Sequence, residues 1–295
     1  RHTRYWRDWS SDVCSSDLLS NCFAKRATTD QTNLIDASLI ATLKTRLTTA
    51  STSPLFTTSD KTTVSGFIAT LNLEQSIIAL RTGTDYAQQI TGLNTIITNN
   101  TYGTFGIITQ TIFFTTVKMI FDKRTTLDAT GALTNKQITP LFNTTTALRG
   151  TPLTTAAQQT TLSNTYGGII EVEKAIEDAY ANADYATKLT ATQSVINRYG
   201  SRTVVAFTQN LFMALLQTLI DNRPRTDLAQ LNTLKTIITS VTPATFTLLS
   251  AAQKANLPTL TTTLNNDILA LQRLDLIIPP ATNTTAIAQI GRAHV

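Results

Sequence analysis

Apolar residues along most of the chain recur at spacings of three and four, which is the period of an amphipathic helix. In residues 33–47, the apolar positions Leu39, Leu43 and Leu47 lie four residues apart. A half-buried strand would instead alternate at a spacing of two. Thr, Val and Ile favour sheets in general, but the period decides against them here. The pattern therefore predicts an all-α fold.

The chain also resembles itself at an interval of about 95 to 99 residues, with several blocks in the same order. The matching blocks are PLFTTSDKTTVSGF (54–67) with PLTTAAQQTTLSNT (152–165) and TLLSAAQKANLPTL (247–260), TDYAQQI (84–90) with ADYATKL (183–189), YG (102–103) with YG (199–200), and TQTIFF (109–114) with TQNLFM (208–213). At about twice this interval, DASLIATLKTRLTT (36–49) matches DLAQLNTLKTIITS (227–240). Such self-similarity predicts a tandem helical repeat, with about four helices in each unit.

The repeats predict where the chain divides. The expected parts are an N-terminal segment with one capping helix at 19–54, repeat unit 1 at 55–152, repeat unit 2 at 153–247, and a truncated repeat unit 3 at 248–288. The third helix of each complete unit is the most apolar. Its first copy, at 106–121, contains Gln110 and Lys118, so we expect a buried core helix rather than a membrane span, which needs about 20 predominantly apolar residues.

Helix-capping residues recur at the same places in the copies. Capping boxes, in which the N-cap and N3 side chains each bond the other's backbone N–H, are predicted at Thr57 with Asp60, Thr155 with Gln158, and Ser250 with Gln253. Asp85 and Asp184 are the expected N-caps of the second helix. Gly103 and Gly200 stand where that helix should end, as left-handed C-caps. Tyr102 and Tyr199, beside these glycines, are expected to pack against the helix ends.

The two ends of the chain are related through the genetic code. Residues 290–295 (IGRAHV) can be encoded by a DNA sequence whose reverse complement translates as residues 12–17 (DVCSSD). Both ends resemble translated sequencing-library adapter, and we exclude residues 1–18 and 289–295 from reasoning about the fold. The remaining residues are expected to be a fragment of a longer open reading frame.

Composition narrows the chemistry of residues 19–288. They contain no His and a single Cys, Cys22, so a Cys/His zinc site or a Ser-His-Asp site cannot be built. Charged residues make up 15% of the chain and the formal net charge is +5, without a basic cluster interleaved with aromatics, so nucleic-acid binding is not expected. No nucleotide-binding or calcium-binding motif is found. We therefore expect no metal, no cofactor and no enzymatic activity.

Two candidate sites remain in the sequence. Asp122 with Arg124, and Asp221 with Arg223, recur at the end of the third helix. They are either a repeated ligand contact or turn residues that form caps or a surface ion pair. The acidic stretch EVEKAIED (171–178) has carboxylates four residues apart, but mixed charge on a helix is typical of a solvated face.

The segment Leu18 to Ala24 gives the only indication of location. It resembles the end of a signal peptide, and Cys22 within it resembles a lipoprotein cysteine. Export or display at the cell surface is therefore favoured. The alternative is a helix end.

Three functions fit these patterns. The first is a non-catalytic structural or interaction protein whose Thr-rich helical repeats bind a protein or polymer partner. The second is the spacer of a larger enzyme whose catalytic domain lies outside these residues. The third, an O-glycosylated stalk, is disfavoured because proline is sparse and the apolar period is strong.

Overall fold

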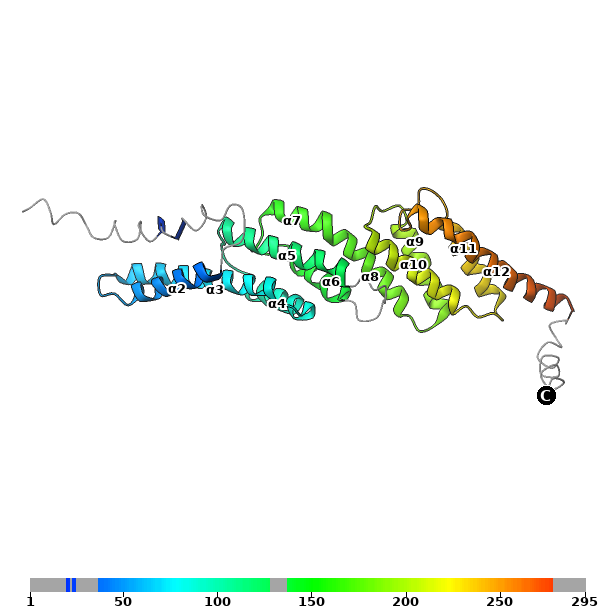
Figure 1. Cartoon of the computed structure of the whole chain (residues 1–295), viewed down its shortest axis with the longest axis horizontal. Helices are drawn as coiled ribbons and strands as arrows, with labels where there is room; N and C mark the ends of the chain where they lie inside the picture. Colours follow the sequence, from blue (N-terminus) through cyan, green and yellow to red (C-terminus); the bar gives the residue numbers. More distant parts are fainter. Residues whose placement is uncertain (1–19, 22, 25–36, 128–136, 278–295) are drawn as a thin grey trace, which may run out of the picture. The chain divides into compact units, whose positions relative to one another are not determined.

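The computed structural model describes residues 20, 21, 23, 24, 37–127 and 137–277. Within these residues every regular element is a helix (Figure 1), which confirms the all-α prediction. The helices are α2 (Ala37–Ser51), α3 (Thr58–Thr82), α4 (Tyr86–Asn99), α5 (Ile107–Leu127), α6 (Ile138–Ala147), α7 (Ala156–Leu162), η1 (Ser163–Gly167), α8 (Gly168–Ala181), α9 (Tyr185–Tyr199), α10 (Ala206–Asp221), α11 (Leu228–Ser240) and α12 (Ala251–Ile277). The ends 1–18 and 289–295 and the segment 128–136 lie outside the described residues.

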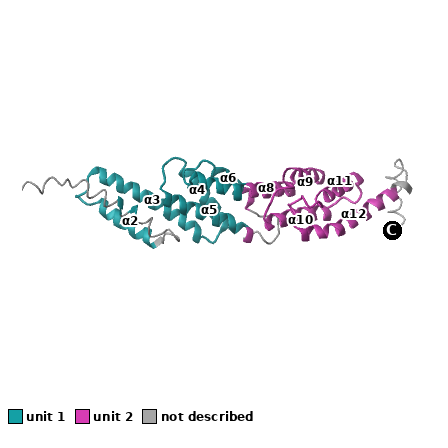
Figure 2. Cartoon of the chain, turned by 90° about the horizontal axis from the view of Figure 1, so that it is seen from above, with its two compact units in different colours: residues 1–124, 140–167 teal, residues 125–139, 168–295 magenta. Residues whose placement is uncertain are grey.

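The chain forms two compact units (Figure 2). Unit 1 comprises residues 1–124 and 140–167, and unit 2 comprises residues 125–139 and 168–295. These units follow spatial contacts, so they do not test the boundaries expected from the sequence, which stay predictions. The first turns of the second copy, in α7, belong to unit 1.

In unit 1, α3 packs against α2 and, after a short connection, against α4. Five side chains of α3 are buried. They are Asp60, Val64, Leu71, Glu74 and Ile77. The core of the unit continues through Leu93 on α4 and through Phe113 and Phe121 on α5, which are all fully buried. The ring of Phe121 meets that of Tyr166 edge to face, with centroids 5.2 Å apart.

In unit 2, one buried cluster joins α8 to α12. α8 packs against α9 and α10, and α11 packs against α9 and α12. Phe246, in the connection between α11 and α12, lies 5.5 Å from Phe212 between ring centroids. A Cβ atom added to Gly200 would come within 2.9 Å of the Phe246 ring, so this tight contact requires a glycine.

Threonine is compatible with these helices because its hydroxyl group bonds to its own helix. Oγ1 of Thr45, Thr91 and Thr190 donates to the carbonyl four residues earlier, at 2.9, 2.9 and 3.0 Å. Many other helical threonines do the same. This bonding satisfies the hydroxyl without a partner from another helix. The exposed surface of such a helix therefore presents threonine methyl groups as well as polar atoms.

The helix starts carry the capping bonds that the sequence suggests. Thr57 Oγ1 accepts from Asp60 N at 3.2 Å, and Asp60 Oδ2 accepts from Thr57 N at 3.0 Å. The corresponding distances are 3.2 and 2.9 Å for Thr155 with Gln158, and also for Ser250 with Gln253. Asp85 accepts from Gln88 N at 3.1 Å, and Asp184 from Thr187 N at 2.7 Å. The bonds from Thr187 lower the pKa of the exposed Asp184 carboxyl.

The second helices do not end as expected. α4 ends at Asn99 with Asn100 as its cap, so Gly103 lies in the loop beyond it, although its φ of 142° is positive. Gly200 does cap α9, but with φ of −56°, which is right-handed rather than left-handed. Its carbonyl accepts from Thr247 N at 2.6 Å, and this bond replaces a left-handed turn. Tyr102 is 93% exposed and Tyr199 is buried, so only Tyr199 packs as expected.

A π-helical turn, η1, interrupts the helix that runs from α7 to α8. Together α7, η1 and α8 are one residue longer than α3. Before this turn, Thr57 and Thr155 lie 98 residues apart, whereas Glu74 and Glu173, after it, lie 99 apart. A π turn accommodates one extra residue in an α-helix, so η1 absorbs this single-residue difference.

One described helix, α3, is long and apolar enough to cross a membrane by length and composition alone. The sequence pattern instead indicates residues 106–121, which include most of α5, as the most apolar helix of unit 1. Leu71, Glu74 and Ile77 of α3 are fully buried within unit 1, while 28% of its apolar window is buried in all.

Candidate functional site

Both recurring arginines bond to backbone carbonyls, and Arg124 is buried while Arg223 is partly buried. Arg124 is 2% exposed, and its Nη1 donates to Phe121 O at 2.8 Å. Arg223 Nη1 donates to Ile220 O at 2.6 Å, while its Nε and Nη2 lie 2.6 and 2.5 Å from Oδ2 of Asp267 on α12. Each arginine thus bonds the carbonyl three residues before it, and for Arg223 this carbonyl lies in the last turn of α10.

The aspartates of these two motifs point to other partners. Asp122 Oδ1 accepts from the Tyr166 hydroxyl at 2.8 Å, and burial together with this bond raises the pKa of Tyr166 above its usual value. Asp221 Oδ1 accepts from Gln217 Nε2 at 2.9 Å. The described contacts of Asp122, Arg124, Asp221 and Arg223 connect these residues to their own helices and to neighbouring ones, and a repeated ligand contact at these residues stays a prediction.

A buried glutamate joins the first and third helices in both units. Thr109 Oγ1 on α5 donates to Glu74 Oε1 on α3 at 2.7 Å. Thr208 Oγ1 on α10 donates to Glu173 Oε1 on α8, also at 2.7 Å. Both glutamates and both threonines are 0% exposed. Sequence reasoning missed these pairs, although both residue types recur 99 residues apart.

The glutamines that follow these two threonines also form matching hydrogen bonds in the two units. Gln110 Nε2 donates to Pro152 O at 3.0 Å, and Gln209 Nε2 donates to Thr247 O at 3.0 Å. Each bond links the start of a third helix to the loop before the next first helix. The side chains of Glu74, Thr109 and Gln110, and of Glu173, Thr208 and Gln209, therefore take part in contacts between helices or between a helix and a loop.

On the surface of unit 2, Glu171 of α8 gathers three side chains. Arg198 Nη2 and the Tyr199 hydroxyl of α9 lie 2.8 and 3.0 Å from Glu171 Oε1, and Arg202 Nη1 lies 3.5 Å from Oε2. Burial, and secondly the bond to Glu171, raises the pKa of Tyr199. These contacts bridge α8 and α9.

Unit 1 has an open groove at the corresponding place, which we call the α3–α4 groove. Its volume is about 400 Å³, within the range of about 300–1,000 Å³ typical of ligand pockets. Its lining residues are Asn72, Leu73, Ser76, Leu80, Gly92, Thr95, Ile96, Asn99 and Asn100. Asn72, Asn99 and Asn100 stand 99 residues before Glu171, Arg198 and Tyr199, so the bridging groups of unit 2 are replaced by carboxamides.

At the floor of the groove, the two units differ in side-chain size at two neighbouring positions. A Cβ atom on Gly92 would lie 2.5 Å from Leu80 Cδ2, so Gly92 makes room for the leucine. The residues 99 positions later are Ala179 and Ala191. A large and a small residue in unit 1 thus take the places of two alanines in unit 2.

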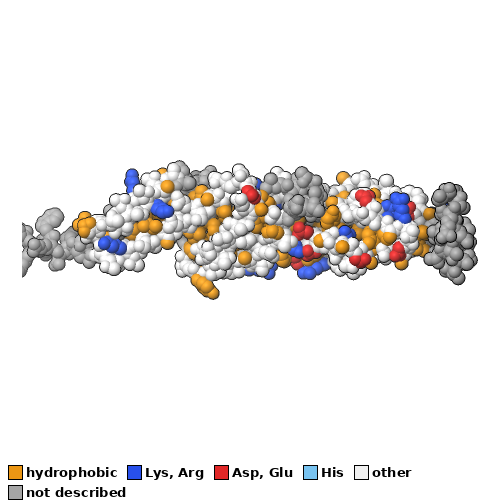
Figure 3. All heavy atoms as spheres, turned by 90° about the horizontal axis from the view of Figure 1, so that it is seen from below, with side chains coloured by type: hydrophobic (Ala, Val, Ile, Leu, Met, Phe, Trp, Pro, Cys, Tyr) orange, Lys and Arg blue, Asp and Glu red, His pale blue; other side chains and the backbone are white. Residues whose placement is uncertain are grey.

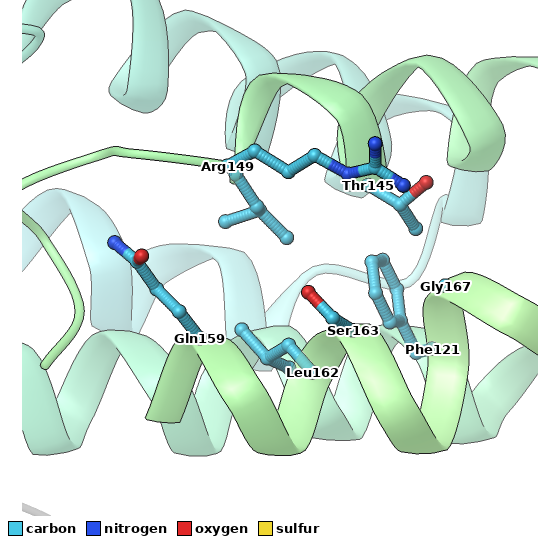
Figure 4. Close-up of a pocket in the computed structure, with 8 residues that line it drawn as sticks. Phe121, Thr145, Arg149, Gln159, Leu162, Ser163 and Gly167 are labelled. Carbon is cyan, nitrogen blue, oxygen red and sulfur yellow. The ribbon is translucent and has the colours of Figure 1, made fainter. Parts of the chain in front are cut away.

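Two other hollows lie elsewhere in the two units. In unit 1, Gln159, Leu162 and Ser163 face Arg149 and Thr145 across a small pocket (Figure 4). Its open volume of about 10 Å³ holds about one water molecule. In unit 2, an open hollow of about 550 Å³ lies between the α9–α10 loop and the start of α12. Lys254, at its edge, donates to Pro243 O at 2.6 Å.

No metal centre emerges from the part of the chain that the structure describes. No three His, Cys, Asp or Glu residues gather there closely enough to hold a metal ion. On the face shown in Figure 3, charged side chains are scattered over a mostly uncharged surface.

No family model, curated protein or solved structure matches this chain.

Proposed function

We propose that this chain is a tandem-repeat helical protein that works by binding a partner and not by catalysis. The observation that carries the repeat is the recurrence of long-range hydrogen bonds from residues 99 positions apart. Glu74 with Thr109 corresponds to Glu173 with Thr208, and the Gln110 bond corresponds to that of Gln209. Independent folds would have no reason to share these bonds.

Helix α12 supports a third, incomplete copy. Its buried Leu257 and Leu264 stand 193 residues after Val64 and Leu71 of α3, which are also buried. At the same interval, Asp267 follows Glu74. An acidic residue therefore recurs at one position of the first helix in all three copies. In α12 it pairs with Arg223 of the preceding helix α10.

The non-catalytic role rests on how the polar residues are used. Buried Glu74, Glu173 and Arg223 all have helix-to-helix contacts in the described structure. Repeated helices of this kind present extended surfaces for a partner, which we propose to be a protein or another polymer. Because charge is sparse, contacts with this partner should depend little on salt.

Titration of the whole chain on arrays of peptides and of neutral polysaccharides tests this function. Saturable binding is expected to at least one array, with an affinity that changes little between about 50 and about 500 mM NaCl. Steep weakening with salt would contradict the proposed mode of contact. Turnover of the bound peptide or polysaccharide would contradict the non-catalytic role.

A further inference from the structure

The α3–α4 groove of unit 1 has the dimensions of a short binding site. Its α3 lining runs from Asn72 to Leu80, which spans about 12 Å at about 1.5 Å per residue. An extended peptide rises about 3.3 Å per residue, so the groove accommodates about four residues. The Leu80 side chain and Gly92 form one end, and Asn72 with Asn99 and Asn100 forms the other.

The contrast with unit 2 shows that an open groove is not required by the helix packing. In unit 2, Glu171, Arg198 and Tyr199 bridge the equivalent helices. In unit 1, the shorter carboxamides leave the space open. The same helical framework thus exists in a bridged and an open form.

The chemistry of the groove favours an uncharged occupant. None of its lining residues is ionisable, so a charged ligand would lose water without gaining an opposite charge. Carboxamides offer both donors and acceptors, which match the N–H and C=O groups of a peptide backbone. Leu73, Leu80 and Ile96 offer an aliphatic surface for a side chain.

An exposed tyrosine adds a second feature at the amide end. Tyr102 follows Asn100 by two residues and is 93% exposed. The residue 99 positions later is Ser201, so unit 2 lacks this ring. Tyrosine is enriched among residues that dominate the energy of protein interfaces. The open groove and the exposed ring therefore occur together in unit 1.

We propose that the α3–α4 groove binds a short, extended, uncharged peptide segment of a partner protein. The backbone of the segment bonds to Asn72 and Asn99, and one aliphatic side chain rests on Leu73 and Leu80. The aliphatic side chains of Leu73, Leu80 and Ile96 lie beside the carboxamides of the lining, and this combination favours a peptide, which offers both an aliphatic side chain and backbone N–H and C=O groups, over a sugar. This inference rests on the proposed binding function and assigns it to one surface.

The test uses the whole chain with capped hexapeptides that contain one Leu among Ala, Thr and Asn. Analogues with Asp or Lys and the neutral sugar maltohexaose serve as alternative probes. Side-chain amide resonances of Asn72 and Asn99 in nuclear magnetic resonance spectra report the site. The variant Asn72→Glu/Asn99→Arg/Asn100→Tyr introduces the bridge of unit 2 and should close the groove.

A milder variant, Asn72→Ala/Asn99→Ala, removes exposed amides without adding bulk, and Asn143→Ala on α6 is the matched control. We expect uncharged hexapeptides to shift both resonances. Their affinity should fall about tenfold or more in the alanine variant, as the loss of about two hydrogen bonds implies, and should remain unchanged in the control. Charged analogues should bind more weakly.

Three results would overturn the proposal. Peptide binding that survives both groove variants would place the binding surface elsewhere and leave the proposed function intact. Maltohexaose that shifts the two amides while peptides do not would make the occupant a glycan. Wild-type protein that binds none of the hexapeptides would refute the groove as a peptide site, and the salt-dependent array titration would then decide the wider function separately.

Discussion

At the scale of single residues, two buried glutamates fasten third helices to first helices. Glu74 and Glu173 each accept a hydroxyl hydrogen bond at 2.7 Å, from Thr109 and Thr208 respectively. A buried acceptor that loses its donor is costly because no water replaces it. These threonines therefore differ from the many exposed ones, whose hydroxyl groups bond only to their own helix.

Substitution of these threonines should destabilise both units alike. We expect Thr109→Val and Thr208→Val each to lower the free energy of unfolding by about 1–3 kcal/mol, because a buried hydrogen bond to a carboxyl group is lost. Thr115→Val is the control, because Thr115 is exposed and bonds only Thr111 O of its own helix. Urea denaturation measures all three. Destabilisation in one unit only would contradict the equivalence of the two pairs.

Tyr185 provides a residue-level prediction about pH. Its hydroxyl donates to Leu219 O at 2.7 Å, and burial raises its pKa to about 12. Because the folded pKa exceeds the value of about 10 for an unfolded tyrosine, its contribution to stability is complete below about pH 10 and lost as the pH rises to about 12. The difference between the ultraviolet titration curves of the wild type and of Tyr185→Phe should show a midpoint near pH 12. A midpoint near 10 would contradict it.

Residue spacing shows what the sequence could and could not reveal. The caps and the all-α fold follow from local patterns, which act within one helix turn. The pairing of Tyr102-Gly103 with Tyr199-Gly200 was wrong in structure, because those residues lie 97 apart whereas the flanking blocks lie 99 apart. At the correct interval, Tyr199 corresponds to Asn100. The bonds of Glu74 and Glu173 could not be derived locally because their partners lie on other helices.

At the scale of elements, the π turn η1 accommodates the one residue by which α7, η1 and α8 together exceed α3 in length. It adds one residue between Leu162 and Gly168 without changing the faces that the flanking segments present. A single-residue change in a regular helix would instead rotate everything beyond it by about 100° relative to the core. Removal of a residue from η1 should therefore cost less stability than removal of a residue from the regular part of this helix.

Deletion of Asn164 tests this explanation. The exposed Asn164 lies within η1, and its removal should leave a regular helix of the length of α3, with a loss of at most about 1 kcal/mol of stability. Deletion of the exposed Ser194 from α9 is the matched control and should cost several times more, because it turns buried residues toward solvent. Equal losses in thermal unfolding would contradict the explanation.

Exposed threonines lead to a second prediction for the helices. Because the Thr91 hydroxyl bonds only Ala87 O of α4, it adds little to tertiary packing. Thr91→Ala should therefore stabilise the chain by a few tenths of a kcal/mol, about the difference in helix propensity between the two residues. Denaturant titration of Thr91→Ala and of Thr192→Ala, which changes a buried position, would separate the effect of helix propensity from that of side-chain packing. A clear loss of stability in Thr91→Ala would contradict the argument.

At the scale of the whole molecule, the repeat and the compact units divide the chain differently. Sequence similarity predicts copies that begin near residues 55, 153 and 248, whereas contacts divide the chain at 124–125, 139–140 and 167–168. Contact units of a repeat array need not follow its sequence period, because each repeat leans on its neighbours. The α3–α4 groove was least accessible from sequence, because it arises where unit 1 lacks the bridge that Glu171, Arg198 and Tyr199 form in unit 2.

Exchange of one copy for the other tests the central claim, that the chain repeats one helical unit. Residues 72–124 would be replaced by residues 171–223, which have the same length and carry the matching Glu–Thr pair. If the copies are equivalent, the chimera keeps its helical circular dichroism, and its thermal midpoint falls by no more than about 10 °C. Loss of the helical signal, or of a cooperative transition, would contradict the repeat.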